Sequence, residues 1–163
     1  MSAPATDRER AENEGREGNF GRILLASEGR PIPDAAIDRV AELAGEGASV
    51  HVFAIARVHG VAFGLPNPGL MPTKAEWAEQ RRIVDNAIWR LERRGLKAEG
   101  SVLGTRKSTA RICDEARKEE CEAIVMAADA DRNPLIGGML WEQEPQRVRR
   151  KARIPVFLVR EPA

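Results

Sequence analysis

The sequence has few of the residues from which most metal sites are built. Only two of its 163 residues are cysteine and only two are histidine. A structural zinc ion takes about four nitrogen or sulfur ligands, which two cysteines and two distant histidines do not supply. No metal site is therefore expected. Cys113 and Cys121 are expected to be buried, reduced thiols, which indicates a reducing, cytoplasmic compartment.

Aromatic residues and surplus charge are scarce as well. Phe and Trp make up 4% of the chain, Tyr is absent, and 26 Lys and Arg nearly balance 25 Asp and Glu. This balance gives no reason to expect nucleic acid or an anionic membrane as a partner. Nor do aromatic side chains alternate with basic ones, as a base-stacking surface requires. The basic run 147–153 is interpreted as a solvated helix face, with a partner-binding patch as the alternative.

Long apolar runs are missing. None approaches the ~20 residues that span a bilayer, and no signal-peptide core follows the N-terminus. Residues 1–19 are polar and almost free of large apolar side chains, so they cannot bury enough surface to offset the entropy lost on ordering. We therefore predict a disordered N-terminal tail, 1–19, followed by one domain, 20–163.

The signature motifs of several enzyme classes are absent too. The chain has no G-x-x-x-x-G-K-[ST] phosphate cradle, no G-x-G-x-x-G dinucleotide turn and no G-x-S-x-G nucleophile elbow. A phospho-accepting receiver domain needs acidic residues after the first strand and an aspartate after the third, where only Glu28 is available. Neither His51 nor His59 has an evident nucleophile partner. A catalytic role is therefore not expected, and His51, which alternates with apolar residues, is interpreted as a surface or hydrogen-bonded side chain.

What is present is an alternation of apolar strands with amphipathic helices. We predict strands at 22–27, 49–56, 97–104, 123–126 and 154–159, and helices at 34–44, 73–94 and 108–116 and after Glu144-Pro145. Gly45 or Gly47 is expected to end the first helix, and Thr73 with Glu76 forms a capping box for the second. Five strands alternating with four helices predict an α/β three-layer sandwich with a five-stranded, mostly parallel sheet.

Two long loops are the candidate functional segments. The loop 127–141 follows a buried strand, and ligands of parallel sheets gather at the carboxyl ends of the strands. The loop 58–72 is rich in Gly and Pro; a loop of this length is usually functional or covers a site. It is expected to be a ligand lid or to pack over the domain edge or a neighbouring subunit.

Three segments in order resemble the universal stress protein family, over roughly 20–160. They are the strand and turn ILLASEG, the helix and strand STARICDEARKEECEAIVMA, and the ending VRRKARIPVFLVR. The resemblance implies a Rossmann-like, adenine nucleotide alpha hydrolase-like fold and a non-enzymatic, cytoplasmic stress-response regulator. It also implies a homodimer through the last strand, Ile154 to Val159, which would otherwise leave an apolar edge unpaired. Val156 and Leu158 are the expected interface residues.

The family's ATP-binding members carry G-x-x-G, about nine residues, and then G-[ST] between the last two strands. This chain departs from that pattern, with Ala127 and Ala130 in place of the two glycines and Glu142-Gln143 in place of G-[ST]. The carboxylates of Glu142 and Glu144 would repel phosphates bound at this place. In addition, Glu28 replaces the aspartate that usually follows the first strand. ATP or another nucleotide as cofactor is therefore disfavoured.

The alternative is a binding module that uses the altered pocket for a nucleotide or another small molecule. Its polar contacts would include Glu28, Asp129 and Arg132, since an arginine there can hold an anion. Arg132 is otherwise a solvated charge or an ion-pair partner of Asp129 or Asp131. The candidate ligand-binding residues are Ser27, Glu28, Ala127, Asp129, Arg132, Asn133 and Gln143.

Overall fold

A computed structural model describes residues 19–57, 72–129 and 143–160 with their side chains. Of the two long loops it describes only short backbone pairs, β3 (Val61–Ala62) with β4 (Leu65–Pro66) and β7 (Leu135–Ile136) with β8 (Met139–Leu140), each antiparallel. The predicted tail therefore lies outside the described residues except for Asn19. So do the side chains of the predicted loop 58–72, apart from Pro72.

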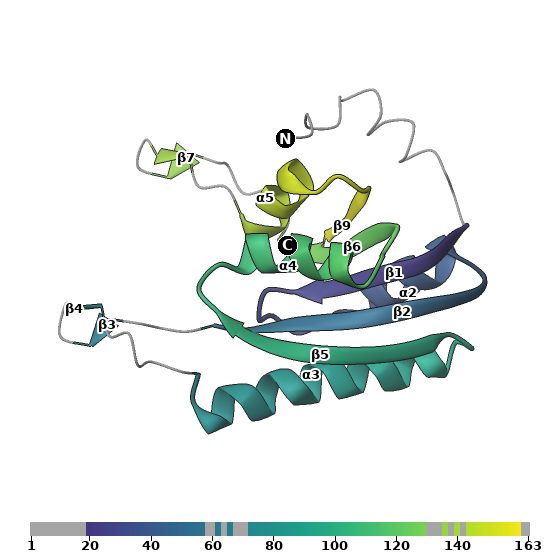
Figure 1. The fold of residues 1–163 in the computed structure, drawn as a ribbon, viewed down its shortest axis with the longest axis horizontal. Coiled ribbons are helices and arrows are strands. Elements are labelled where there is room, and N and C mark those ends of the chain that lie inside the picture. The colour runs from purple at the N-terminus through teal and green to yellow at the C-terminus, as the bar shows by residue number, and fades with distance from the viewer. Residues whose placement is uncertain are drawn as a thin grey trace.

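Five strands form one sheet in the order β5-β2-β1-β6-β9, and every neighbouring pair is parallel (Figure 1). The prediction of an α/β fold with a five-stranded parallel sheet is confirmed. The strands are β1 (Phe20–Ser27), β2 (Ala44–Arg57), β5 (Lys97–Thr105), β6 (Ala123–Ala128) and β9 (Val156–Arg160). The helices are α2 (Asp34–Leu43), α3 (Lys74–Glu92), α4 (Ser108–Lys118) and α5 (Glu144–Lys151).

The central strand β1 has a core on each of its two faces. Ile23 and Leu25 point into a cluster with buried residues of α2 and α3, whereas Leu24 and Ala26 point into a second cluster with α4 and α5. Alternate side chains of a strand face opposite sides, so a strand buried on both faces must be apolar throughout. This explains the unbroken apolar run of β1 and produces the three layers.

The boundary between α2 and β2 differs from the prediction. Neither Gly45 nor Gly47 ends the first helix, because α2 stops at Leu43 and the backbone of Ala44 already pairs with Phe20 of β1. The extra strand residues are accommodated by a shift in register between Phe20 and Arg22. Strand pairing, which the local sequence does not reveal, decided where the helix stopped.

The last strand also begins later than predicted, at Val156 rather than Ile154, and continues to Arg160. Val156 is only 5% exposed and belongs to the core cluster under α4 and α5, whereas Leu158 is half-buried. An acidic residue at Val156 would therefore unfold the protomer, so the substitution cannot report on an interface. Of the two residues expected at the dimer interface, Leu158 is the one suited to a test.

One helix start has the capping hydrogen bond that was predicted, and another has a cap that was not predicted. The Thr73 hydroxyl accepts a hydrogen bond of 3.2 Å from the backbone N–H of Glu76, and Gln143 and Gln146 form a reciprocal capping box at the start of α5. Within the described part of the chain, no helix is long and apolar enough to cross a membrane.

The two cysteines are free thiols, Cys121 buried and Cys113 half-buried. Burial raises the pKa of Cys121 to about 11 and raises the pKa of Cys113 above its ordinary value as well. Because the thiolate is the reactive species, both side chains should react slowly in the folded protein.

Alkylation should therefore report on folding. In a Cys113→Ser variant, iodoacetamide at pH 8 is expected to modify Cys121 at least about 100-fold more slowly in the native protein than in urea, since only about one thiol in a thousand is ionised at a pKa of about 11. The native rate should rise about tenfold per pH unit up to that pKa. Mass spectrometry of timed samples measures both rates, and a native rate within tenfold of the unfolded one would contradict the expectation.

Candidate functional site

The strand order reverses between β1 and β6, where ligands of open parallel sheets bind. Since α2 follows β1 on one face and α5 follows β6 on the other, the two connections diverge and leave a crevice at the carboxyl ends of these strands. Glu28 comes directly after β1 and Asp129 directly after β6. Both predicted site residues therefore lie at the crevice.

A cavity of about 580 Å³ opens here, which we call the strand-end pocket. Among the described residues that line it, three carboxylates face two guanidinium groups, a net charge of −1. A pocket of net negative charge repels a polyphosphate and so disfavours its binding, whatever the shape of the pocket. Its lining residues are Glu28, Gly29, Arg30, Pro31, Arg57, Glu76, Gln80 and Asp129.

Arg30 joins the two sides of the strand-end pocket. Its Nε donates to the Glu28 carboxylate, and its Nη1 donates to Oδ1 of Asp129 at 2.9 Å. The turn is fixed locally, because the Ser27 hydroxyl donates to the Arg30 carbonyl and Gly29 adopts a φ of +120°, which only glycine reaches without strain. The arginine therefore spans the crevice between β1 and β6.

Two buried acceptors of the pocket lack a hydrogen-bond partner among the described residues, Oε2 of Glu28 and Oε1 of Gln80. Two donors nearby are engaged, since Arg57 Nε donates to the Glu28 carbonyl at 2.8 Å and Gln80 Nε2 donates to the Gly29 carbonyl at 3.1 Å. An unsatisfied buried acceptor costs stability, and a donor that reaches it recovers that cost. These two oxygens are the atoms most suited to hold a ligand.

The remaining predicted residues divide into three groups. Gln143 lies beside the pocket, because its side-chain oxygen accepts from the backbone N–H of Asp129 at 3.3 Å. Ala127 lies within β6, paired with Val159 and 5% exposed, and does not line the pocket, so the structure does not place it as a contact residue. Arg132 and Asn133, like Ala130 and Glu142, lie outside the described residues.

The sequence analysis missed Arg30, Arg57 and Gln80. Arg57 is the last residue of β2, so the rule that singled out Glu28 would also have found it. Gln80 had a visible signal as well, since it occupies a buried position of α3 in line with Ile83 and Val84. Arg30 had none, because its partner Asp129 is 99 residues away along the chain.

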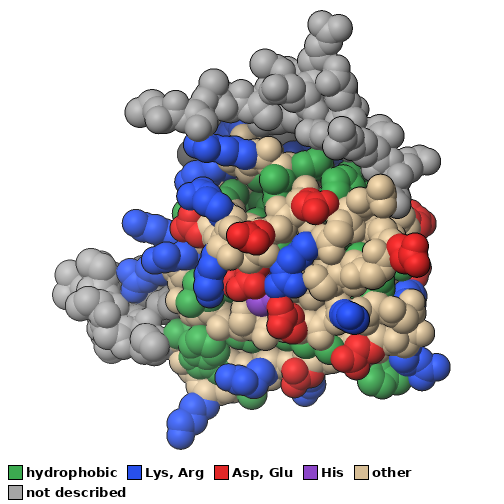
Figure 2. Space-filling model, turned by 45° about the vertical axis from the view of Figure 1, so that its right-hand side comes forward, with side chains coloured by type: hydrophobic (Ala, Val, Ile, Leu, Met, Phe, Trp, Pro, Cys, Tyr) green, Lys and Arg blue, Asp and Glu red, His purple; other side chains and the backbone are tan. Residues whose placement is uncertain are grey.

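The described residues contain one group with the composition of a metal site, His51, Glu115 and Glu119, whose ligand atoms lie within 4.8 Å of one another. In Figure 2 a small part of a histidine side chain is visible at the surface, surrounded by acidic and basic side chains. Nε2 of His51 lies 3.1 Å from Glu115 and 3.2 Å from the Ser101 hydroxyl. His51 is thus hydrogen-bonded, as the sequence analysis allowed.

Positive charge is already present in this cluster. Arg22 donates to Glu99 and Glu119 at 2.8 Å each and to the Ser49 hydroxyl at 2.9 Å. The bond to Arg22 holds the pKa of Glu99 below its usual value. A cation bound by Glu119 would have to compete with this guanidinium, so we interpret the cluster as a structural tie between β1, β2, β5 and α4.

The comparisons with known proteins agree with this fold. The chain resembles a protein of the universal stress protein family from Burkholderia pseudomallei, at 22% identity and a TM-score of 0.60 over 86% of this chain and 96% of that one. A universal stress protein from Archaeoglobus fulgidus matches at 20% identity and a TM-score of 0.61, over 84% of this chain and 91% of that one. The structure of the universal stress protein from Archaeoglobus fulgidus in complex with dAMP matches at 19% identity and a TM-score of 0.59, over 84% of this chain and 95% of that one.

At such identities the structural neighbours show the fold alone, and none of the curated proteins matches the chain. The assignment therefore depends on the family model described as "Universal stress protein family", which matches residues 19–160. That range takes in the whole sheet, the four helices and the strand-end pocket. The match extends over most of the chain, and the protein belongs to the universal stress protein family.

Proposed function

We propose that the protein is a non-enzymatic, cytoplasmic stress-response regulator that does not bind ATP as the ATP-binding members of its family do. The ion-pair bridge of Arg30 carries this proposal. Its guanidinium occupies the crevice where a nucleotide would enter, bound to Glu28 on one side and Asp129 on the other. A nucleotide would have to break both contacts and bring its phosphates into a pocket of net charge −1.

Nucleotide content tests this proposal directly. Protein purified under native conditions and then denatured is expected to release no stoichiometric nucleotide by mass spectrometry. Titration calorimetry with ATP is expected to show no saturable binding tighter than about 1 mM. One ATP per chain in the purified protein would overturn the proposal.

The second candidate is a binding module for a nucleotide or a similar small ligand without a long phosphate chain. The unpartnered oxygens of Glu28 and Gln80 favour it, since both accept hydrogen bonds of the kind that an amino or hydroxyl group donates. Structural neighbours were solved in complex with dAMP, with cAMP and with AMP. Hydrogen exchange with and without AMP distinguishes the candidates, because only a ligand-binding module gains protection at residues 27–31 and 76–80.

The regulator is proposed to act as a homodimer through β9. This strand pairs with β6 on one side and with no described strand on the other. An open edge strand exposes unpaired backbone donors and acceptors, which proteins usually cover. A second copy related by a two-fold axis would cover both edges at once.

A further inference from the structure

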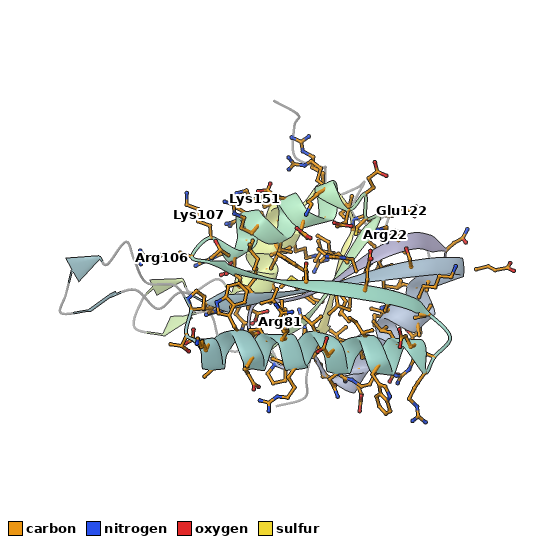
Figure 3. The ribbon with its side chains drawn as sticks, turned by 60° about the horizontal axis from the view of Figure 1, so that its bottom comes forward. Arg22, Arg81, Arg106, Lys107, Glu122 and Lys151 are labelled. Carbon is orange, nitrogen blue, oxygen red and sulfur yellow. The ribbon has the colours of Figure 1, made fainter. Side chains whose placement is uncertain are left out.

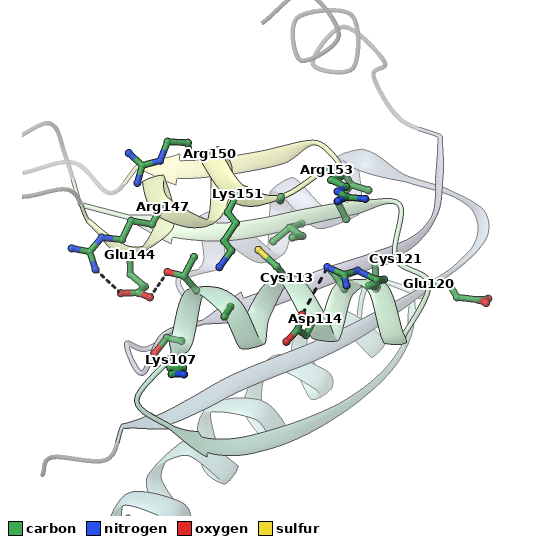
Figure 4. Close-up of a pocket in the computed structure, with 18 of the residues that line it drawn as sticks. Lys107, Cys113, Asp114, Glu120, Cys121, Glu144, Arg147, Arg150, Lys151 and Arg153 are labelled. Atoms are coloured by element: carbon green, nitrogen blue, oxygen red, sulfur yellow. Dashed lines mark hydrogen bonds and ion pairs between the residues drawn. The ribbon is translucent and has the colours of Figure 1, made fainter. Parts of the chain in front are cut away.

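The larger cavity of the described structure lies away from the strand-end pocket. About 1160 Å³ in volume, it runs between α4 and α5 on one face of the sheet, and we call it the α4–α5 groove (Figure 4). No residue lines both cavities. The basic run 147–153, interpreted from the sequence as a solvated face, contributes four of the groove's basic side chains.

The rim of the groove carries a strong surplus of positive charge. Seven Lys and Arg residues line it against three Asp and Glu, a net charge of +4, whereas the whole chain carries only +1. Lys and Arg side chains also crowd one flank of the molecule in Figure 2. The seven are Arg106, Lys107, Arg117, Arg147, Arg150, Lys151 and Arg153.

Two of the three rim carboxylates already have partners. Glu144 accepts a hydrogen bond from the Thr109 hydroxyl and lies 3.7 Å from Arg147. Asp114 lies 3.8 Å from Arg117. The surplus positive charge is therefore not neutralised by the acids of the groove itself.

Three of the rim cations are exposed and form no salt bridge with any described residue, Lys107, Lys151 and Arg153. They are the rim charges most available to an incoming partner.

The floor of the groove is apolar. It consists of small and aliphatic side chains with the two cysteines, which remain neutral thiols at pH 7 because burial raises the pKa of Cys121 to about 11 and raises that of Cys113 too. A basic rim around an apolar floor matches a ligand that is apolar on one side and acidic along its margins. The floor residues are Ala110, Cys113, Ala116, Cys121, Ile124, Ala152 and Ile154.

The arrangement of the cations indicates an elongated ligand. Lys107 and Arg153 lie at opposite ends of the groove, with Lys151 between them (Figure 4). The 11 residues of α4 give this wall a length of about 16 Å, some three helical turns. A phosphate site would need cations that converge on one point, and none of the described residues that line the groove is aromatic and able to stack a base.

We propose that the α4–α5 groove binds an acidic amphipathic helix of a partner protein, with the apolar face of that helix on the floor and its carboxylates along the basic rim. The inference deepens the proposed regulatory function, because it assigns the surface and the chemistry through which a partner is recognised. It does not involve the strand-end pocket, so the nucleotide measurement and the one below can fail separately.

A designed peptide tests the groove. The probe is a fluorescein-labelled helix of Leu, Ala and Glu, about 18 residues and ~27 Å long, with leucines on one face. Fluorescence anisotropy with the full chain is expected to show binding at least about tenfold tighter than for a scrambled peptide of the same composition. Binding should weaken as salt rises, since exposed charges are screened.

Charge reversal locates the site. The triple variant Lys107→Glu, Lys151→Glu and Arg153→Glu is expected to weaken binding of the amphipathic peptide at least about tenfold. All three side chains are exposed, so the fold should survive, which circular dichroism checks.

The matched control reverses three exposed charges elsewhere, Lys74→Glu, Arg81→Glu and Lys97→Glu on α3 and β5, and should leave binding unchanged. Figure 3 shows Lys107 and Lys151 on one side of the sheet and Arg81 on the other.

Three results would overturn the proposal. The first is binding of the scrambled peptide as tight as that of the amphipathic one, and the second is an equal loss of affinity in the two triple variants. The third is displacement of the peptide by inorganic polyphosphate or duplex DNA that binds more tightly than the peptide does, with the loss of affinity again confined to the groove variant. That last result would make the groove a site for phosphate polymers rather than for a protein helix.

Discussion

Replacing Gly100 with alanine is expected to lower the free energy of unfolding by about 2–3 kcal/mol, and replacement with valine by more. A Cβ atom at this position would lie 2.5 Å from Cγ1 of Val84 and 2.7 Å from the carbonyl oxygen of Val52. Val84 is 3% exposed, on the face of α3 that packs against the sheet. Neither the Val52 carbonyl of β2 nor the stiff, β-branched side chain of Val84 can yield as a flexible side chain does. Therefore α3 must move away from β5, and the pairing of β5 with β2 must shift.

Gly21→Ala is the matched control, since Gly21 is also a strand glycine. A Cβ there meets only the end of the Glu122 side chain, at 3.3 Å, which can rotate away. The Gly21→Ala substitution should lower the free energy of unfolding by no more than about 0.5 kcal/mol. Thermal unfolding measures both variants, and at roughly 2–4 °C per kcal/mol the Gly100 variant should melt about 5–10 °C below the parent. Equal melting temperatures for the two variants would contradict the predicted close packing of α3 on β5.

Replacing Leu158 with proline is expected to convert the proposed dimer into a monomer. The Pro155 carbonyl accepts from the N–H of Ile124 at 2.9 Å, so it points toward β6. Backbone groups of a strand alternate in direction, and the N–H of Leu158 therefore points outward from the open edge. Proline there removes a donor that only a partner strand would use and keeps the bonds between β9 and β6.

Leu158→Ala is the control, because it removes the same apolar side chain and keeps the outward N–H. Light scattering coupled to size exclusion should give the mass of a dimer for the parent and the alanine variant, and about half that mass for the proline variant. A proline variant that remains dimeric while retaining its circular dichroism spectrum would exclude β9 as the interface.

The two cavities differ in charge and in size, so they suit different kinds of ligand. The strand-end pocket is small, negative and bridged by the protein's own arginine, whereas the α4–α5 groove is larger and positive. In this family the crevice at the strand ends would be the first place to look for a ligand. In this chain the charge and size of the groove favour the face of the sheet covered by α4 and α5 for partner binding.

Much of the architecture was predictable from local patterns. The apolar run of β1, the capping residue Thr73 and the alternation of strands with helices are each properties of neighbouring residues. Such patterns predicted the five strands of the main sheet, the four helices and the layer structure, but not the short pairs β3–β4 and β7–β8. They failed at Gly45 and Gly47, where strand pairing with β1 rather than a glycine stop ended α2.

The amino-acid sequence by itself determined the parallel α/β fold, the family resemblance and the loss of the glycine pattern for phosphates, because all three depend on residue type and order along the chain. Tertiary structure alone decided that Arg30 bridges Glu28 and Asp129, which is 99 residues away, and that the basic residues before α4 and in α5 line one groove. The physical reason is that these contacts depend on which strands are neighbours in the sheet and on which face each helix packs.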